Sequence, residues 1–270
     1  ETAGALYELY SHVLQKEYTP LKKVPARVIL VEAMDRLLGP YPDKLQQSAY
    51  KQLESLGVEI ILGQMVKEVY EDRVILSGGE EIRSHTLVWA AGVKASPLAK
   101  MLNVELQRGG RVPVEPTLEV TGMENVYAIG DIAYLIDQKT GRAHPQVIPV
   151  AQQQAKRAAN NILSRINGKE QKAFVYKDKG SMATIGRSRA VAWIFNKIQM
   201  SGYFAWLAWL GLHLMTLLGF RNRASVFINW IWNYTTYDRA ARVVLNYDEI
   251  LDREENRTQT QEQEIVTVER

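Results

Sequence analysis

The sequence predicts a doubly wound α/β fold that is interrupted by a β-meander. Short apolar runs alternate with segments of helical periodicity, the runs end in carboxylates or small residues, and a Gly-Gly pair follows one alternating segment. Continuous apolar runs are typical of parallel strands buried on both faces, and their alternation with helices is typical of βαβ units. The 270 residues are 46% hydrophobic and contain no cysteine, which excludes a disordered chain, a disulfide scaffold and a cysteine-ligated metal site.

The first expected elements lie within residues 1–62. Apolar residues recur at three- and four-residue steps in residues 1–17, which predicts a helix. Residues 27–32 form a continuous apolar run that ends in Glu32, as expected of a buried parallel strand. A second helix is expected at residues 42–56, with Gly57 at its end, and a second strand at residues 58–62.

The later elements follow the same logic. An alternating segment before Gly78-Gly79 predicts a hairpin with these glycines as its turn. The remaining expected elements are strands at residues 86–92 and 125–131, a helix at 150–166, and strands around a Gly180 turn in residues 174–185.

Residues 198–220 contain no Lys, Arg, Asp or Glu. A helix needs ~20 residues, at ~1.5 Å each, to span ~30 Å of hydrocarbon, so the run is long enough. Interfacial aromatic residues lie throughout it and glycines lower its helix propensity, which favours a two-helix anchor lying in the membrane interface. The alternatives are a single membrane span and a buried core helix.

Two acidic residues are candidate ligand-binding groups. Glu32 lies at the carboxyl end of a buried strand, where it can accept both hydroxyls of an adenosine ribose and repel a 2'-phosphate, or can simply end a strand in water. The glycine-rich phosphate loop that should precede the first helix is absent from the 270 residues, and we expect it just before Glu1. Glu1 would then lie in the first turn of the helix that receives the pyrophosphate, or only complement the helix dipole.

Three further motifs have both a functional and an ordinary interpretation. Gly130-Asp131 can bring the backbone near a ligand and offer a carboxylate to a polyol, or form a turn. Ala90-Ala91-Gly92 permits close approach of a cofactor or ends a strand. Amides of Gln152-Gln153-Gln154 can hydrogen-bond a quinone or flavin carbonyl, or belong to a polar helix start.

Neither a metal site nor a nucleic-acid surface is predicted. His12, His85 and His144 are isolated and show no metal-ligand spacing. The net charge is only +3, and the basic residues are not gathered in a patch or tail.

Taken together, the motifs resemble the type II NADH:quinone oxidoreductases, also called alternative NADH dehydrogenases. The similarity covers residues 1 to about 245 and rests on the order and spacing of seven fragments. These fragments are Glu-Thr-Ala-Gly at the start, Val-Ile-Leu-Val-Glu32, Val-Trp-Ala-Ala-Gly92, Val-Tyr-Ala-Ile-Gly-Asp131, Asp-Lys-Gly-Ser-Met-Ala-Thr-Ile-Gly186, Ala-Trp-Leu-Ala-Trp-Leu and Gly-Phe-Arg-Asn-Arg223.

The resemblance implies a two-dinucleotide-binding, Rossmann-like flavoprotein fold with FAD and NADH as cofactors. By similarity, Glu32 would bind the NADH ribose, and Ala91 and Gly92 would line the nicotinamide side. Gly130 and Asp131 would hold the FAD ribityl chain. Glu1 would match an acidic residue that is implicated in catalysis near the nicotinamide and the flavin.

The family's quinone motif, Ala-Gln-x-Ala-x-Gln, matches only in part. Its last Ala and Gln fall on Ala151 and Gln153, whereas its first Ala-Gln falls on Ile148-Pro149. Gln152 or Gln146 is therefore the expected substitute for the first glutamine.

The resemblance also implies an N-terminally truncated chain with five parts. It implies a peripheral, monotopic protein on the cytoplasmic face of a bacterial inner membrane, with lipid and quinone as partners and homodimerisation allowed. A non-catalytic, membrane-associated nucleotide-binding module remains the alternative. The expected parts are 1–93 (NADH domain), 94–170 (returning FAD domain), 171–197 (C-terminal strands), 198–245 (anchor helices) and 246–270 (polar tail).

Overall fold

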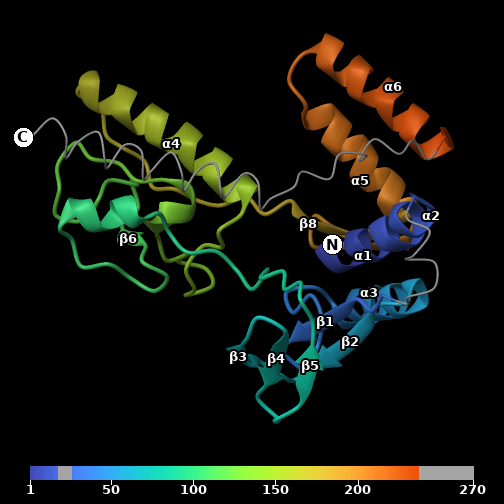
Figure 1. The fold of residues 1–270 in the computed structure, drawn as a ribbon. Helices are drawn as coiled ribbons and strands as arrows, with labels where there is room; N and C mark the ends of the chain where they lie inside the picture. The colour runs from blue at the N-terminus through green and yellow to red at the C-terminus, as the bar shows by residue number, and fades with distance from the viewer. Residues whose placement is uncertain (18–25, 237–270) are drawn as a thin grey trace, which may run out of the picture. The chain divides into compact units, whose positions relative to one another are not determined.

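The computed structural model describes residues 1–17 and 26–236 (Figure 1). The chain divides into two compact units. The first unit comprises Glu1–Glu8 and Pro25–Trp209, and the second comprises Leu9–Val24 and Leu210–Arg270. All candidate site residues lie in the first unit, which carries every strand of the described residues.

A parallel pair of strands and one helix form the start of the α/β layer. Strand β1 (Ile29–Glu32) pairs in parallel with β2 (Glu59–Leu62), and the connecting helix is α3 (Asp43–Leu56). Gly57 ends α3 in a left-handed conformation with φ 103°, as its position in the sequence predicted. The β1–α3–β2 unit therefore confirms the expected order of elements, with each boundary shifted by at most two residues.

A three-stranded antiparallel meander follows, as predicted. Its strands are β3 (Val66–Val69), β4 (Arg73–Leu76) and β5 (Glu81–Arg83). Gly78-Gly79 is the turn of the β4–β5 hairpin, as predicted, whereas the alternating segment before it forms two strands that a separate turn joins. A small core beneath the meander consists of Val74, Leu76 and Ile82.

Two expected strands are not formed. Residues 86–92 are irregular and exposed, and Trp89 is 64% exposed, so the apolar run has no strand partner among the described residues. Residues 125–131 contribute only one bridge, between Tyr127 and Glu119. The positive φ angles of Asn125 (64°) and Gly130 (71°) interrupt the extended backbone there.

The next part of the first unit surrounds a core of its own. Strands β6 (Val112–Pro113) and β7 (Ala133–Tyr134) pair in parallel, and α4 (Ile148–Ile166) covers the same core. Two 3₁₀-helices, η3 (Pro97–Leu102) and η4 (Gly130–Ile132), complete this region. The buried side chains of the core include Val112, Leu118, Val120, Ala133, Val150 and Phe174.

The last sheet of the first unit packs against α1 and α3. Strands β8 (Gly180–Gly186), β9 (Arg189–Ile194) and β10 (Ile198–Gly202) form an antiparallel sheet in the order β10-β9-β8. Two expectations are corrected here. Residues 174–179 are not a strand, so Gly180 begins β8 and is not a turn between strands, and Ile198–Gly202 belong to this sheet and not to a helical anchor. One face of α3 packs on the sheet through Leu45, Ala49 and Leu53, which recur at four-residue steps.

Helix α1 (Thr2–Glu8) lies directly on β8. A Cβ atom at Gly4 would come within 1.7 Å of the carbonyl oxygen of Ile185, so only glycine permits this approach. The expected helix over residues 1–17 is not continuous, because a π-helix, η1 (Leu9–Leu14), separates α1 from α2 (Gln15–Glu17).

Two consecutive helices follow the last sheet, as the preferred prediction for the apolar run required. They are α5 (Tyr203–Thr216) and α6 (Phe220–Thr236). None of the helices in residues 1–17 and 26–236 is both long and apolar enough to cross a bilayer. Residues 237–245 of the expected anchor and the expected polar tail at 246–270 lie outside the described residues.

Candidate functional site

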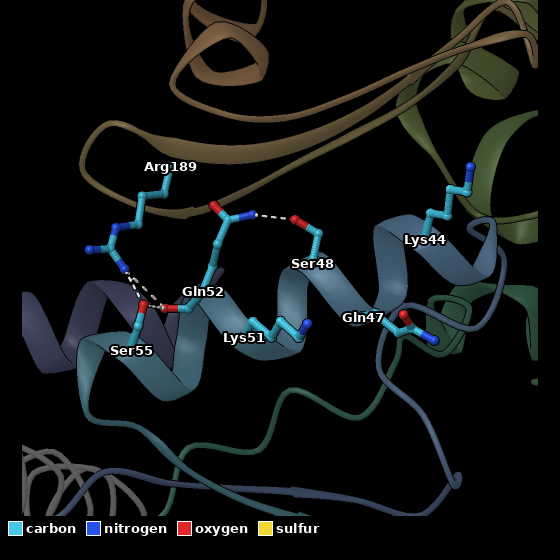
Figure 2. A pocket seen from close by; sticks show the side chains of 7 residues that line it. All are labelled: Lys44, Gln47, Ser48, Lys51, Gln52, Ser55 and Arg189. Atoms are coloured by element: carbon cyan, nitrogen blue, oxygen red, sulfur yellow. Dashed lines mark hydrogen bonds between the residues drawn. The ribbon is translucent and has the colours of Figure 1, made fainter.

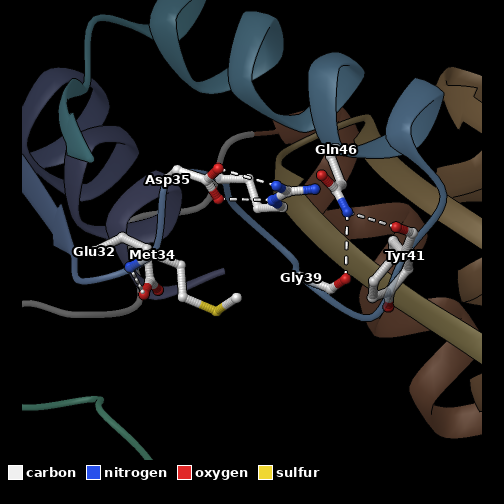
Figure 3. Close-up of polar contacts among 7 residues, drawn as sticks. Glu32, Met34, Asp35, Gly39, Tyr41 and Gln46 are labelled. Atoms are coloured by element: carbon white, nitrogen blue, oxygen red, sulfur yellow. Dashed lines mark hydrogen bonds and ion pairs between the residues drawn. The ribbon is translucent and has the colours of Figure 1, made fainter. Parts of the chain in front are cut away.

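The Glu32 carboxylate lies at the carboxyl end of β1, the end at which open parallel sheets bind ligands. Its Oε1 atom accepts a 3.0 Å hydrogen bond from the backbone N–H of Met34 (Figure 3). The bond fixes the direction of the Glu32 side chain at the end of β1, and the second carboxylate oxygen, Oε2, takes no part in this bond. This arrangement suits an acceptor of ribose hydroxyls.

The loop after Glu32 is ordered by its own polar contacts. Arg36 donates two hydrogen bonds to Asp35, at 2.7 and 2.9 Å. This pair lowers the pKa of Asp35 and raises the pKa of Arg36. The amide of Gln46 donates to the carbonyl oxygens of Gly39 and Tyr41 (Figure 3), so the loop is tied to the first turns of α3.

A second cluster forms around Gly130 and Asp131. The Gly130 N–H donates a 2.7 Å hydrogen bond to Oε1 of Gln154 on α4, and the Gln146 amide donates to the carbonyl oxygen of Asp131. A Cβ atom at Gly130 would lie 3.3 Å from Cβ of Ala151. The structure thus brings three of the predicted residues together: Gly130, Asp131 and Ala151.

Gln154 is the buried one of the three consecutive glutamines at the start of α4. Its side chain is 1% exposed, and its Nε2 atom has no hydrogen-bond partner among the described residues. A buried amide donor without a partner costs free energy, about 1–3 kcal/mol. An acceptor-rich group such as FAD beside Gly130 would supply the missing partner, so the residues present fit this cofactor.

The two neighbouring glutamines differ in their surroundings. The Gln153 amide pairs with the backbone of Lys177, donating at 3.1 Å and accepting at 3.0 Å. It therefore ties α4 to the segment before β8. The Gln152 side chain is exposed. The roles of Gln152 and Gln153 toward a quinone stay predictions.

Glu1 lies at the start of α1 and is bound to β8. Its Oε1 atom accepts hydrogen bonds from the Thr184 backbone N–H at 2.9 Å and from the Thr184 hydroxyl at 3.2 Å. Burial and the nearby Glu1 carboxylate raise the pKa of Tyr41 to about 12, partly offset by a hydrogen bond with Ser181. Tyr41 is therefore a neutral hydroxyl at physiological pH.

Ala91 and Gly92 lie in the exposed, irregular segment after β5. Gly92 has φ 97°, and no heavy atom lies within 4 Å of the position that a Cβ would take. No hydrogen bond or ion pair among the described residues joins Glu1 or Glu32 to the Gly130–Asp131 cluster. The candidate residues therefore form separate local sites.

A buried arginine, Arg111, binds the backbone that follows Asp131. Arg111 donates hydrogen bonds to the carbonyl oxygens of Ala133 and His144, and burial lowers its pKa. The ring of His144 packs edge-on against Phe174, at a centroid distance of 5.2 Å, and burial likewise lowers its pKa. The sequence named His144 only as an isolated histidine and did not indicate Arg111, because the partners of both residues are backbone carbonyls or a ring distant in the chain.

The described residues contain no group of three or more His, Cys, Asp or Glu side chains arranged to hold a metal ion. The chemistry of the candidate sites is that of carboxylates, amides and hydroxyls.

Comparison with known proteins places these features in a family. The family model described as pyridine nucleotide-disulphide oxidoreductase matches residues 1–155, and the model described as NDH2 C-terminal domain matches residues 179–236. Residues 1–155 are more than half of the chain.

Curated relatives extend the similarity over most of the chain. The type II NADH:quinone oxidoreductase Ndh of Mycobacterium tuberculosis is 40% identical over 241 residues, which cover 85% of this chain and 50% of that protein. The internal alternative NAD(P)H-ubiquinone oxidoreductase A1 of Arabidopsis thaliana mitochondria is 32% identical over 250 residues, covering 87% and 48%. The chain thus spans about half the length of the curated relatives it matches.

A solved structure shares the fold. The structure of NDH2 from Plasmodium falciparum in complex with NADH matches with a TM-score of 0.78 at 16% identity, covering 88% of this chain and 64% of that one. This agreement confirms the predicted dinucleotide-binding fold. With the family model matching residues 1–155, the chain belongs to the pyridine nucleotide-disulphide oxidoreductase family.

Proposed function

We propose that this chain is part of a type II NADH:quinone oxidoreductase that uses FAD. The observation that carries the proposal is the 40% identity, over 241 residues, to a relative with that name. Two sites agree with the proposal. Glu32 at the end of β1 can accept hydrogen bonds from a ribose, and Gln154, beside Gly130 and Asp131, has an amide donor without a partner among the described residues.

The residues of this chain would bind and orient the reactants. Glu32 holds the adenosine ribose of NADH and disfavours a 2'-phosphate through its charge. Asp131 and Gln154 hold FAD, and Ala91 and Gly92 leave room beside the nicotinamide. FAD, when bound, supplies the chemistry of taking two electrons from NADH and giving them to a quinone. Glu1 stands near the reacting rings as a proton-handling carboxylate.

The membrane association of this enzyme would come from α5 and α6. Apolar side chains at these helices are strongly exposed, with Leu218, in the bend between them, at 88% and Phe220, at the start of α6, at 86%. Monomeric soluble proteins rarely expose so large an apolar area, which favours insertion into a lipid interface. We propose that the protein is monotopic, on the cytoplasmic face of a bacterial inner membrane, and that the quinone arrives from the lipid. A homodimer is compatible with this arrangement.

Two measurements test the proposal. The complete protein should be yellow when loaded with FAD, and its flavin absorbance should bleach on addition of NADH and return on addition of a soluble quinone. Binding to phosphatidylcholine vesicles should be lost in Leu218→Asp/Phe220→Asp, while NADH oxidation with a soluble acceptor is retained. A colourless protein that takes up no FAD would instead support the non-catalytic nucleotide-binding module.

A further inference from the structure

A basic groove lies along α3, beside Arg189 of β9, and none of its lining residues is a candidate cofactor residue (Figure 2). Its volume is about 530 Å³. Three cations line it, Lys44 and Lys51 from α3 and Arg189 from β9, and the remaining lining groups are neutral. These neutral residues are Gln47, Ser48, Gln52 and Ser55.

The cations of the groove form no ion pair with an acidic side chain among the described residues. Lys44, Lys51 and Arg189 take part in none of the ion pairs found in residues 1–17 and 26–236. Asp43 and Glu54 lie on the same helix, but neither lines the groove. The charged residues that line the groove are therefore all cations, whose charge an anion can neutralise.

Arg189 is held in place by neutral partners. One of its guanidinium nitrogens donates to the carbonyl oxygen of Gln52 and to the hydroxyl of Ser55 (Figure 2). The Gln52 amide in turn donates to the Ser48 hydroxyl at 3.0 Å. These bonds orient the guanidinium toward the groove and leave other donors of its fork for a phosphate group, the anion that arginine recognises well.

The groove continues to the first residues of the aromatic helix. A second groove shares Ser48, Gln52 and Arg189 with the first and extends to Tyr203 at the start of α5. The adjoining apolar side chains are exposed, with Tyr203 at 54% and Phe204 at 71%. Exposed aromatic residues next to cations are typical of the level of the phospholipid headgroups.

We propose that this groove binds the phosphate of an anionic phospholipid headgroup. Arg189 and Lys51 contact the phosphate, and Lys44, near the other end of α3, adds positive charge to the groove. Tyr203 and Phe204 enter the adjoining interface. This inference rests on the membrane association proposed above. It adds that the preference for anionic lipid comes from α3 and β9, and not from the apolar side chains of α5 and α6.

Vesicle binding of a matched pair of variants tests the inference. Lys44→Gln/Lys51→Gln removes two groove cations, and Lys67→Gln/Lys100→Gln removes two exposed cations elsewhere in the first unit. Each basic residue near an anionic surface contributes roughly fivefold to affinity. We therefore expect roughly 25-fold weaker binding of the groove variant to phosphatidylglycerol-containing vesicles, unchanged binding to pure phosphatidylcholine vesicles, and a much smaller effect of the control.

Two results would overturn the inference. Equal losses in the two variants would show that net charge, and no particular site, sets the lipid preference. Full competition by inorganic phosphate at millimolar concentration, measured with the same vesicles, would assign the groove to a soluble phosphate compound. Loss of phosphatidylcholine binding in Leu218→Asp/Phe220→Asp is a separate readout, so failure of the groove and failure of the membrane association are distinguishable.

Discussion

The backbone N–H of Thr184 donates a 2.9 Å hydrogen bond to the carboxylate of Glu1. The bond joins the first residue of the chain to β8, and the Thr184 hydroxyl reinforces it at 3.2 Å. A second acidic residue of α1, Glu8, accepts a 2.6 Å bond from the backbone N–H of Arg187. The two carboxylates thus fasten the two ends of α1 to β8 and to Arg187, which follows it, and the direction of the Glu1 side chain depends on a strand that lies far along the sequence.

Thr184→Val should disturb this relationship without removing the backbone donor. The variant loses the Thr184 hydroxyl, which donates to the Glu1 carboxylate. A hydrogen bond to a charged group contributes about 1.5–3 kcal/mol to stability. We expect a roughly tenfold lower kcat, because the Glu1 side chain loses one of the two donors that orient it. Thr184→Ser, which keeps the hydroxyl, should restore kcat; an unchanged kcat in Thr184→Val contradicts the role of Thr184.

Glu32→Gln should reduce the preference for NADH over NADPH. The neutral amide no longer repels the 2'-phosphate, and one charge at close range in a solvent-exposed site is worth about 1 kcal/mol or more. The ratio of kcat/KM for the two nucleotides should fall about tenfold. Glu59→Gln is the matched control, because it removes the same charge at the opposite end of the neighbouring strand. If both variants keep the original ratio, Glu32 does not contact the ribose.

Gln154→Leu should weaken FAD binding. The change removes the acceptor of the Gly130 N–H and the buried donor that we assign to FAD. Leaving a buried N–H unpaired costs about 1–3 kcal/mol, so the FAD dissociation constant should rise about tenfold or more, as measured by flavin fluorescence. Asn160→Leu, an exposed position on the same helix, serves as the control. Equal FAD affinity in the Gln154 and Asn160 variants would argue against this assignment.

Gly4→Ala should destabilise the first unit. The added methyl group would meet the carbonyl oxygen of Ile185, so α1 must move away from β8. Overpacking of this kind costs about 1–3 kcal/mol, and it should lower the denaturant midpoint of unfolding. Gly211→Ala adds the same methyl group to a helix where no atom lies within 4 Å, and it should be neutral or slightly stabilising. Equal midpoints for the two variants would show that α1 does not pack as closely as described.

Acidification should reduce stability through His144. Burial lowers its pKa in the folded state, so the folded protein binds fewer protons than the unfolded chain. The contribution is fully present above the unfolded pKa of about 6.5 and is lost as pH falls through that value toward the lower folded pKa. His144→Phe should therefore show a flatter dependence of the unfolding free energy on pH between about 8 and about 5, in denaturant titrations. A slope equal to that of the original protein would assign the pH dependence to other groups.

The β1–α3–β2 unit and α4 were predictable because their information is local. Periodic apolar residues indicate helices, and continuous apolar runs indicate buried strands. Gly57 ends α3 because glycine readily adopts the left-handed conformation that this helix end requires. The separation of α5 and α6 also follows from local sequence, since Gly219, with φ 79°, interrupts the apolar run.

Residues 86–92 and 125–131 show where local information fails. Both segments have the composition of strands, but a strand needs a partner, and neither finds a full one among the described residues. Register and pairing depend on residues far along the chain, so they cannot be derived from a window of the sequence.

The sequence by itself determined helices α3 and α4, the parallel β1–β2 pair and the chemical types of the candidate groups, because side-chain periodicity and backbone preference act over a few residues. Only the tertiary structure decided that Thr184 holds Glu1, that Gln154 keeps a buried donor beside Gly130, and that Lys44, Lys51 and Arg189 share one groove. Each of these relationships joins residues distant in the chain, and only the packing of α1, α3 and α4 brings such residues within hydrogen-bonding or electrostatic range.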